Sequence, residues 1–230
     1  MSRNDVAIIT GASRGLGLAL ACQLAQRNWR LVVDARGEDD LEQVARGLRT
    51  LTEVDAIAGD VADAAHRQAL IAAAGGRIDL LVNNASVLGP SPQPRLSAYP
   101  LAELERIFQV NVWAPLALIQ LALPHMDDGC LINVTSDAAV EPYPGWGGYG
   151  SSKAALEQLT AVLGAEHPEL RIYSVDPGDM RTRMHQEAFP GEDISDRPPP
   201  EDSVPGLLAL IDGSLPSGRY RARDLVAVAK

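Results

Sequence analysis

Residues 6–17 read VAIITGASRGLG, an apolar run that leads directly into three spaced glycines. The run VAIIT (6–10) predicts a buried β-strand, and the residues after the glycines have the period of a helix. Between them, Gly11 permits a sharp turn, Gly15 lets the backbone come close to a pyrophosphate, and Gly17 lets the helix pack on the sheet. The start of such a helix offers free N–H groups and the positive end of its dipole. An ordinary strand–helix turn can hold the same glycines, but their place after a first strand favours a dinucleotide site.

The same alternation of short apolar runs and helix-period stretches continues along the chain. Further strands are expected at 31–35, 54–60, 79–85, 130–136, 171–178 and near 219–222, and helices at 16–27, 39–51, 63–74, 101–125 and 149–166. Strands that are apolar on both faces and separated by helices indicate a parallel sheet that is covered on both sides. We therefore predict an α/β fold of the Rossmann type, a doubly wound parallel sheet of about seven strands with helices on both faces, in a single domain spanning 1–230.

One segment departs from this rhythm, the proline-rich and acidic stretch FPGEDISDRPPPEDSVP (189–205). It has no periodicity, and a loop of this length in a compact domain is usually functional or disordered. We expect residues 183–205 to form a lid over a substrate site. A passive insertion is the alternative.

Composition and charge narrow the classes of function. The chain has 230 residues, 46% of them hydrophobic, with a formal charge of −10 and a sequence pI near 4.8. Such acidity disfavours nucleic acid and anionic membranes as partners, because both are bound by basic patches. The longest apolar run, Val112 to Pro124, is too short to span a bilayer and suits a buried or interface helix.

The cysteines and the N-terminus bear on the compartment. Cys22 and Cys130 are far apart and have no CxxC spacing, so neither a disulfide nor a metal site is expected. The first residues lack the layout of a secretory signal. We expect a soluble, cytoplasmic protein with free thiols.

The end of the second expected strand, VVDARG (32–37), bears on the choice of nucleotide. An acid there binds the ribose 2′-OH of NAD, whereas a nearby arginine accepts the 2′-phosphate of NADP. Ala35 occupies the acid's position, Arg36 follows it and Arg14 lies in the glycine turn, so two arginines can converge on a phosphate. Asp34 points opposite to Ala35 in a regular strand, although a shift of one residue would make it a ribose ligand. NADP(H) is therefore favoured, and NAD(H) is the alternative.

A second motif, YGSSK (149–153), contains one of only two lysines in the chain. At helix positions i and i+4, Tyr149 and Lys153 share one face. A free tyrosine has a pKa of about 10, and a neighbouring ammonium is expected to lower it toward the pH at which a catalytic acid or base works best. Arginine would keep the charge, but its planar fork is a poor substitute for a compact ammonium.

Further motifs occur in order along the chain: TGASRGLG (10–17), Asp60, NNA (83–85), Asn111, Ser136, Tyr149-x-x-x-Lys153 and PGDMRT (177–182). Several are common by chance when taken alone, but the full ordered set is specific. From about Val6 to Thr182, the chain resembles the short-chain dehydrogenase/reductase family, in its compact single-domain branch. The resemblance implies an NAD(P)-dependent oxidoreductase that interconverts CH–OH and C=O groups.

The resemblance also implies a role for each matching residue. Asn111, Ser136, Tyr149 and Lys153 would form the catalytic tetrad. The cofactor would be bound by Gly11, Ser13, Arg14, Gly15, Leu16, Gly17, Arg36, Asp60, Val61, Asn83, Ala85, Tyr149, Lys153, Pro177, Gly178 and Thr182. Tyr149 would handle the proton, Ser136 would donate a hydrogen bond to the substrate oxygen, and Asn111 would bind a water that links Lys153 to solvent. Asp60 would hold the adenine amino group, Asn83 and Ala85 would lie along the ribose, and Thr182 would contact the carboxamide.

Two departures from the family pattern affect binding and assembly. Ser86 stands where the family usually has a glycine after NNA, and we expect weaker cofactor binding at most. The C-terminal segment SGRYRARDLVAVAK (217–230) lacks the usual glycine-rich close, which argues against a tetramer. A homodimer through the helices that begin near Asn111 and Tyr149 is expected, with the apolar stretch 112–123 as its contact face, and plain core packing is the alternative.

The expected substrate contacts are Asp137, Tyr143, Trp146 and Met184. Their aromatic and apolar walls suit an uncharged or weakly polar carbonyl compound, and no motif specifies its identity or the physiological direction. A non-catalytic nucleotide sensor on the same fold is the alternative function, which the presence of both Tyr149 and Lys153 disfavours. A sugar-nucleotide epimerase would need a longer chain.

Overall fold

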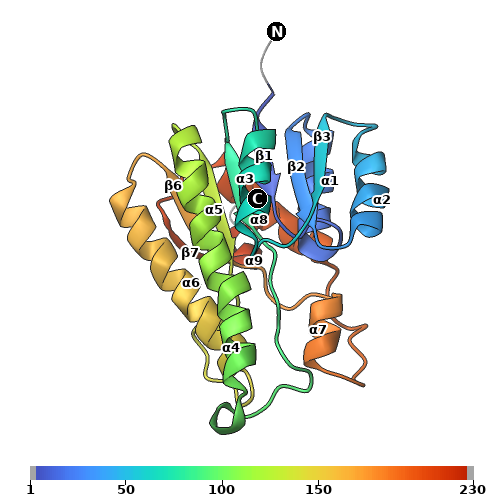
Figure 1. The fold of residues 1–230 in the computed structure, drawn as a ribbon, viewed down its shortest axis with the longest axis vertical. Helices are drawn as coiled ribbons and strands as arrows, with labels where there is room; N and C mark the ends of the chain where they lie inside the picture. The colour runs from blue at the N-terminus through green and yellow to red at the C-terminus, as the bar shows by residue number, and fades with distance from the viewer. Residues whose placement is uncertain (1–3, 227–230) are drawn as a thin grey trace.

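Seven parallel strands form one sheet in the computed structural model, which describes residues 4–226 (Figure 1). The strands are β1 (Val6–Ile9), β2 (Arg30–Ala35), β3 (Val54–Ala58), β4 (Leu80–Asn83), β5 (Cys130–Val134), β6 (Arg171–Asp176) and β7 (Gly218–Arg221). Their order is β3-β2-β1-β4-β5-β6-β7, and each neighbouring pair is parallel. The predicted doubly wound α/β fold is confirmed.

Helices cover both faces of the sheet, because alternate strand residues point to opposite sides. Ile9 and Val33 pack in one core with α1 (Gly15–Gln26), α2 (Glu38–Leu48) and α8 (Val204–Asp212). Ile8 and Val32 pack in a second core with α3 (Ala64–Ala73), α5 (Ala114–Ala122) and α6 (Gly147–Glu166). Strands buried on both faces explain why their sequences are almost continuously apolar.

The helix predicted at 101–125 is a continuous helical stretch with an irregular centre. α4 (Leu101–Phe108) passes through a π-helical turn (Gln109–Trp113) into α5, and a 3₁₀ turn (Leu123–His125) ends it. Its 25 residues are long and apolar enough to cross a membrane, which the shorter apolar run 112–124 did not indicate. Half of its most apolar 18-residue stretch is buried inside the fold, and a buried core helix can have the same length and apolar composition.

The segment 183–205 is more ordered than its sequence indicates. It contains α7 (Arg183–Ala188), and a 3₁₀ turn (Pro200–Ser203) leads directly into α8. Figure 1 shows α7 apart from the helices that cover the sheet. The sequence patterns indicate neither helix, because α7 has too few residues for a period and α8 is buried on most of its surface.

The C-terminal region contains β7, close to its expected place, followed by a short helix α9 (Ala222–Val226). Residues 227–230 of the segment 217–230, which include Lys230, lie outside the described residues. Cys130 on β5 is buried and Cys22 on α1 is partly buried, and both are free thiols. Burial raises the pKa of the Cys130 thiol to about 12, so this cysteine stays protonated and serves as a core residue.

Candidate active site

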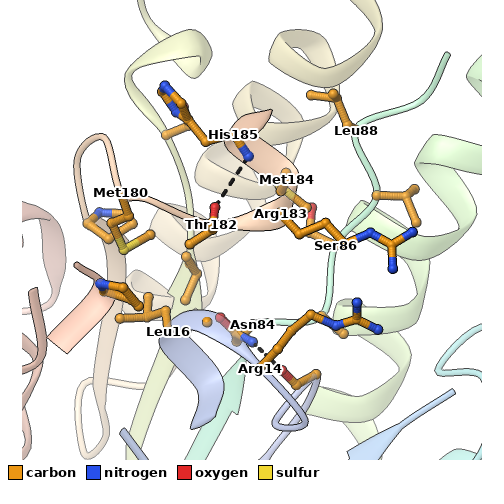
Figure 2. A pocket seen from close by; sticks show the side chains of 18 of the residues that line it. Arg14, Leu16, Asn84, Ser86, Leu88, Met180, Thr182, Arg183, Met184 and His185 are labelled. Carbon is orange, nitrogen blue, oxygen red and sulfur yellow. Dashed lines mark hydrogen bonds between the residues drawn. The ribbon is translucent and has the colours of Figure 1, made fainter. Parts of the chain in front are cut away.

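A cavity of about 550 Å³ lies at the carboxyl ends of the strands. β1 and β4 are neighbours in the sheet, and their connections run to opposite sides, which makes this the point where strand order reverses. Figure 2 shows Leu16 and Asn84 on one side of the cavity and, on the other, Met180 and Thr182 from the segment before α7 and Met184 from α7 itself. Ligands of doubly wound sheets bind at this position.

The glycine turn fits a dinucleotide closely because side chains are excluded from it. Gly11 has φ +67° and Gly15 has φ +58°, values that favour glycine. A Cβ at Gly11 would lie 2.9 Å from the backbone of Ala85, and a Cβ at Gly17 would lie 2.6 Å from the Gly11 carbonyl oxygen. No side chain caps the start of α1, so its N–H groups remain free for a pyrophosphate.

Asn84 holds the glycine turn against β4. Its Nδ2 donates to the carbonyl oxygens of Thr10 at 2.8 Å and Gly11 at 3.1 Å. The Thr10 hydroxyl accepts hydrogen bonds from the backbone N–H groups of Asn84 and Ala85, each at 3.0 Å. This network fixes the ends of β1 and β4 relative to one another, so the floor of the cavity is preorganised.

The surroundings of the β2 end differ for the residues that bear on nucleotide choice: Asp34 is buried, whereas Arg14 and Arg36 are exposed. β2 pairs with β3 in regular register, so the one-residue shift that would expose Asp34 does not occur. Asp34 is 1% exposed and accepts a hydrogen bond from the Gly11 N–H at 2.6 Å. Arg14 and Arg36 are exposed at the cavity wall, and Arg14 lies 3.8 Å from Asp40. Arg36 is therefore available to an anionic group, and Arg14 can turn to one from its exposed contact with Asp40.

Tyr149 and Lys153 lie one turn apart on α6 and both reach the cavity. Lys153 Nζ lies 5.5 Å from the centre of the Tyr149 ring and donates to the Val134 carbonyl oxygen at 2.8 Å. Burial lowers the pKa of Lys153 to about 8, and the nearby Glu157 carboxylate opposes that shift. An ammonium with this pKa can exchange protons near neutral pH.

The pKa of the Tyr149 hydroxyl shifts opposite to the sequence-based expectation. Burial raises it above the usual tyrosine value, and the charges of Asp176 and Asp137 add to the rise. The hydroxyls of Ser86 and Ser136 act in the other direction. The expected lowering of this pKa is therefore wrong as a net result for this structure, because burial and the two carboxylates prevail. The phenol is protonated at neutral pH.

Ser136 faces the cavity at the end of β5, where it begins a short 3₁₀ turn. Its Oγ donates to Asp137 Oδ1 at 2.9 Å, and the Tyr143 hydroxyl donates to Asp137 Oδ2 at 3.0 Å. Of the expected substrate residues, Asp137, Trp146 and Met184 line the cavity. Tyr143 is 44% exposed and reaches the site through Asp137.

Asn111 lies behind the cavity wall, inside the π-helical turn, and is fully buried. Its Oδ1 accepts from the Ser86 hydroxyl at 3.1 Å and the Val87 N–H at 2.9 Å. Its Nδ2 donates to the Val87 carbonyl at 2.9 Å and the Ser152 hydroxyl at 3.0 Å. An amide has four such positions, and all are filled, so the side chain has none left for the expected water. The Asn111 side chain thereby holds the loop that carries Ser86.

A charged network behind Lys153 supports the side of the site that is formed by α6, β6 and β7. Glu157 Oε1 accepts from the Thr135 hydroxyl at 2.7 Å and from Arg219 Nε at 2.9 Å. Arg219 also donates to the Ser136 carbonyl oxygen and to Asp176, each at 3.3 Å. The network ties α6 to β6 and β7, directly beneath the catalytic candidates.

The segment around α7 closes the opposite wall with aromatic side chains. Trp146 lies 5.9 Å from Tyr149 and 5.8 Å from Phe189, measured between ring centres. Phe189 lies 4.9 Å from His185. Thr182 begins α7 and accepts from the His185 N–H at 3.3 Å (Figure 2). The wall facing Tyr149 is therefore largely apolar.

Most of the cofactor and catalytic residues expected from the sequence line the cavity, together with residues that had no expected role. Expected cofactor residues on its wall are Gly11, Ser13, Arg14, Gly15, Leu16, Arg36, Asp60, Val61, Ala85, Tyr149, Lys153, Pro177, Gly178 and Thr182. Asn83 is elsewhere: it is buried in the sheet and donates to Asn133 Oδ1 at 2.8 Å. Wall residues without an expected role include Asn84, Leu88, Met180, Arg183 and His185. Strand alternation favours Asn84 over Asn83 as the outward-facing amide, whereas α7 gives no signal in the sequence.

Comparison with known proteins places this cavity in context. A family model described as short chain dehydrogenase matches residues 5–193. Sepiapterin reductase of Mus musculus is 35% identical over 199 residues, which cover 79% of this chain and 76% of that protein. A short chain dehydrogenase from Pseudomonas syringae has a TM-score of 0.89 at 29% identity, with 96% of this chain and 95% of that chain covered. Another from Escherichia coli CFT073, solved in complex with NADPH, has a TM-score of 0.86 at 28% identity, with 96% and 97% covered.

Proposed function

Because the chain belongs to the short-chain dehydrogenase/reductase family of NAD(P)-dependent oxidoreductases, which act on CH–OH and C=O groups, we propose that it is an NADPH-linked reductase of a small carbonyl compound. Tyr149 is the general acid in reduction and the general base in the reverse reaction. The observation that carries the proposal is the meeting of Tyr149, Lys153 and Ser136 on one wall of a cavity whose floor is the glycine turn.

Each side chain of the site has a distinct task in this proposal. When bound, the nicotinamide exchanges a hydride with the substrate carbon. The Tyr149 hydroxyl donates its proton to the substrate oxygen, and Ser136 donates a hydrogen bond to the same oxygen as negative charge develops there. Lys153 stabilises the phenolate and returns a proton to it. The raised pKa of Tyr149 keeps the phenol protonated and so favours reduction.

The substrate is placed between Tyr149 and α7, with residues 183–205 as its lid. The aromatic wall of Trp146 and Phe189 supports an uncharged or weakly polar compound. Asp137 stands beside Ser136 at the same wall and can accept hydrogen bonds from substrate hydroxyls. Asn111 supports this wall by positioning Ser86, and Asp60 and Thr182 serve the two ends of the cofactor.

NADPH is proposed over NADH because Arg14 and Arg36 are exposed at the cavity wall, where they can bind a 2′-phosphate, while Asp34 is turned inward. The E. coli relative in complex with NADPH supports the same assignment. In a panel of ketones and aldehydes assayed with both cofactors, wild type should turn over at least one compound and prefer NADPH. Arg36→Ala should raise the KM for NADPH about 10-fold or more, as expected for a charge-assisted contact, and leave the KM for NADH nearly unchanged.

Arg46→Ala is the matched control, because Arg46 is an exposed arginine on α2 that pairs with Glu42 away from the cavity. Equal effects of the two substitutions would contradict the 2′-phosphate assignment. Tight NADPH binding by wild type without turnover of any carbonyl compound would instead support a nucleotide sensor.

A homodimer is proposed through the helical stretch 101–125. Leu101 and Trp113 are 73% and 52% exposed on it, which is unusual for large apolar side chains. Trp113→Arg should therefore halve the mass measured by light scattering, from twice the 24.5 kDa chain mass to that of one chain. An unchanged mass for the variant, or a wild-type monomer, would contradict this interface. We also propose a cytoplasmic location, which the two free thiols support.

A further inference from the structure

Asp34 and His66 form a buried hydrogen-bonded pair at the nucleotide end of the cavity. Asp34 Oδ2 lies 2.9 Å from His66 Nε2, and the two side chains are 1% and 6% exposed. Because a carboxylate only accepts hydrogen bonds, Nε2 carries the hydrogen. The other oxygen of Asp34 accepts the Gly11 N–H at 2.6 Å. Both oxygens of this carboxylate are therefore held by the protein.

His66 is held in place by the backbone of a neighbouring loop. It stands in the first turn of α3, and its imidazole lies directly against Gly59, where a Cβ would overlap the ring. Gly59 and the next residue, Asp60, both line the cavity. A hydrogen-bonded chain thus connects the first turn of α3, the end of β2 and the glycine turn, and the His66 ring packs against the β3–α3 loop at Gly59.

Asp34 occupies a critical place for nucleotide choice. It lies at the cavity wall, two residues before Arg36, and its backbone carbonyl accepts the Ala12 N–H at 2.8 Å. A carboxylate that faced the nucleotide from here would accept a ribose 2′-OH and repel a 2′-phosphate. Without His66, Oδ2 would be a buried, unpaired charged atom, and the nearest polar surroundings are in the cavity.

We propose that His66 is a positioning residue that sets cofactor choice by holding the Asp34 carboxylate away from the nucleotide. This inference rests on the proposed NADPH-linked function and names the device that supports it. His66 touches neither the cofactor nor the substrate, and it acts through Asp34. Arg14 and Arg36 attract the 2′-phosphate. The hydrogen bond from His66 keeps the negative charge of Asp34 from facing that phosphate and repelling it.

The test measures binding directly, by calorimetric titration of wild type and variants with NADPH, NADH and the fragments 2′,5′-ADP and 5′-AMP. His66→Val should lower the preference for NADPH over NADH, and for 2′,5′-ADP over 5′-AMP, by about 10-fold, the size expected when one charge faces another across a partly screened site. His66→Gln, whose amide can donate to Asp34, should restore most of the preference. The double variant His66→Val/Asp34→Ser should restore it as well, because the carboxylate itself is gone.

The outcomes separate the inference from the function on which it rests. A wild type that does not prefer NADPH overturns both. If wild type prefers NADPH and folded His66→Val keeps the same preference, the inference alone is overturned. The same is true if all three variants lose affinity for the four ligands equally, since that pattern indicates only a packing role for His66. If His66→Val does not fold, preference retained by His66→Gln but lost in a folded His66→Asn, whose shorter amide cannot reach Asp34, supports the inference, and preference retained by both overturns it.

Discussion

Replacement of Tyr149 by phenylalanine is expected to lower kcat about 10²–10⁴-fold, the usual contribution of a general acid or base. The substitution removes only the hydroxyl that would transfer the proton. The ring is retained, with its packing against Trp146 at 5.9 Å and its place in the cluster with Leu88 and Ala138. The thermal midpoint and the Kd for NADPH should therefore change little. Steady-state kinetics, thermal unfolding and a fluorescence titration measure the three quantities.

Tyr220→Phe is the matched control for the same chemical change. The Tyr220 hydroxyl donates to the Pro216 carbonyl oxygen at 2.8 Å, and this residue is not part of the cavity wall. Its kcat should stay close to that of wild type. If Tyr149→Phe kept wild-type turnover, or lost NADPH binding to the same degree as activity, the assignment of Tyr149 as acid and base would be wrong.

Replacement of Lys153 by methionine is expected to lower kcat by about 10²-fold or more, because the phenolate loses its neighbouring positive charge and its proton source. Methionine is unbranched and of similar length, so it fills the same space. The variant also removes a buried amino group, since Lys153 is only 2% exposed. The Val134 carbonyl oxygen loses the hydrogen bond from Nζ.

The pH dependence of stability tests the burial of this lysine separately from activity. Burial lowers the pKa of Lys153 from 10.5 to about 8. Between these pH values Lys153 keeps its proton in the unfolded chain and has lost it in the folded chain. The free energy of unfolding of wild type therefore rises with pH in this window, and burial of the charged lysine lowers it most below pH 8. The free energy of unfolding of wild type, minus that of Lys153→Met, should rise by roughly 3 kcal/mol from pH 8 to pH 10.5.

Urea unfolding of both proteins at several pH values from 7 to 10.5 measures this difference, and other titrating groups cancel in the subtraction. Glu157→Gln should extend the trend to lower pH, because the Glu157 carboxylate opposes the shift in the Lys153 pKa. A difference that stays flat across this range would show that Lys153 does not titrate near 8 in the folded protein.

The layered fold was accessible from the sequence because its signals are local. Ile8 and Ile9 are adjacent apolar residues that face opposite cores, so a fully apolar run already indicates a central parallel strand. The glycine turn and the Tyr149–Lys153 spacing are likewise local patterns. The sequence patterns did not indicate α7, because it is very short, or α8, because it is apolar nearly all round and so has no helical period.

The electrostatics of the site depended on contacts between distant parts of the chain. Asp176 lies on β6, 27 residues beyond Tyr149, and its charge acts on the phenol only because β6 ends beside α6. The partner of Asp34, on strand β2, is His66 on α3, 32 residues away in the sequence. The sequence patterns therefore indicated the wrong direction for the pKa of Tyr149 and no partner for Asp34. The four hydrogen bonds of Asn111 could likewise be known only from the folded chain.

We propose that this cavity directs a hydride from NADPH to a carbonyl carbon. The most direct test uses NADPH deuterated at one C4 position at a time and the carbonyl compounds of the panel, with the products analysed by mass spectrometry and NMR. Wild type should place deuterium on the carbinol carbon from one C4 position only, because a fixed site presents one face of the nicotinamide to the substrate. NADPH that binds but transfers deuterium to no compound of the panel, or transfers it equally from both positions, would contradict the account.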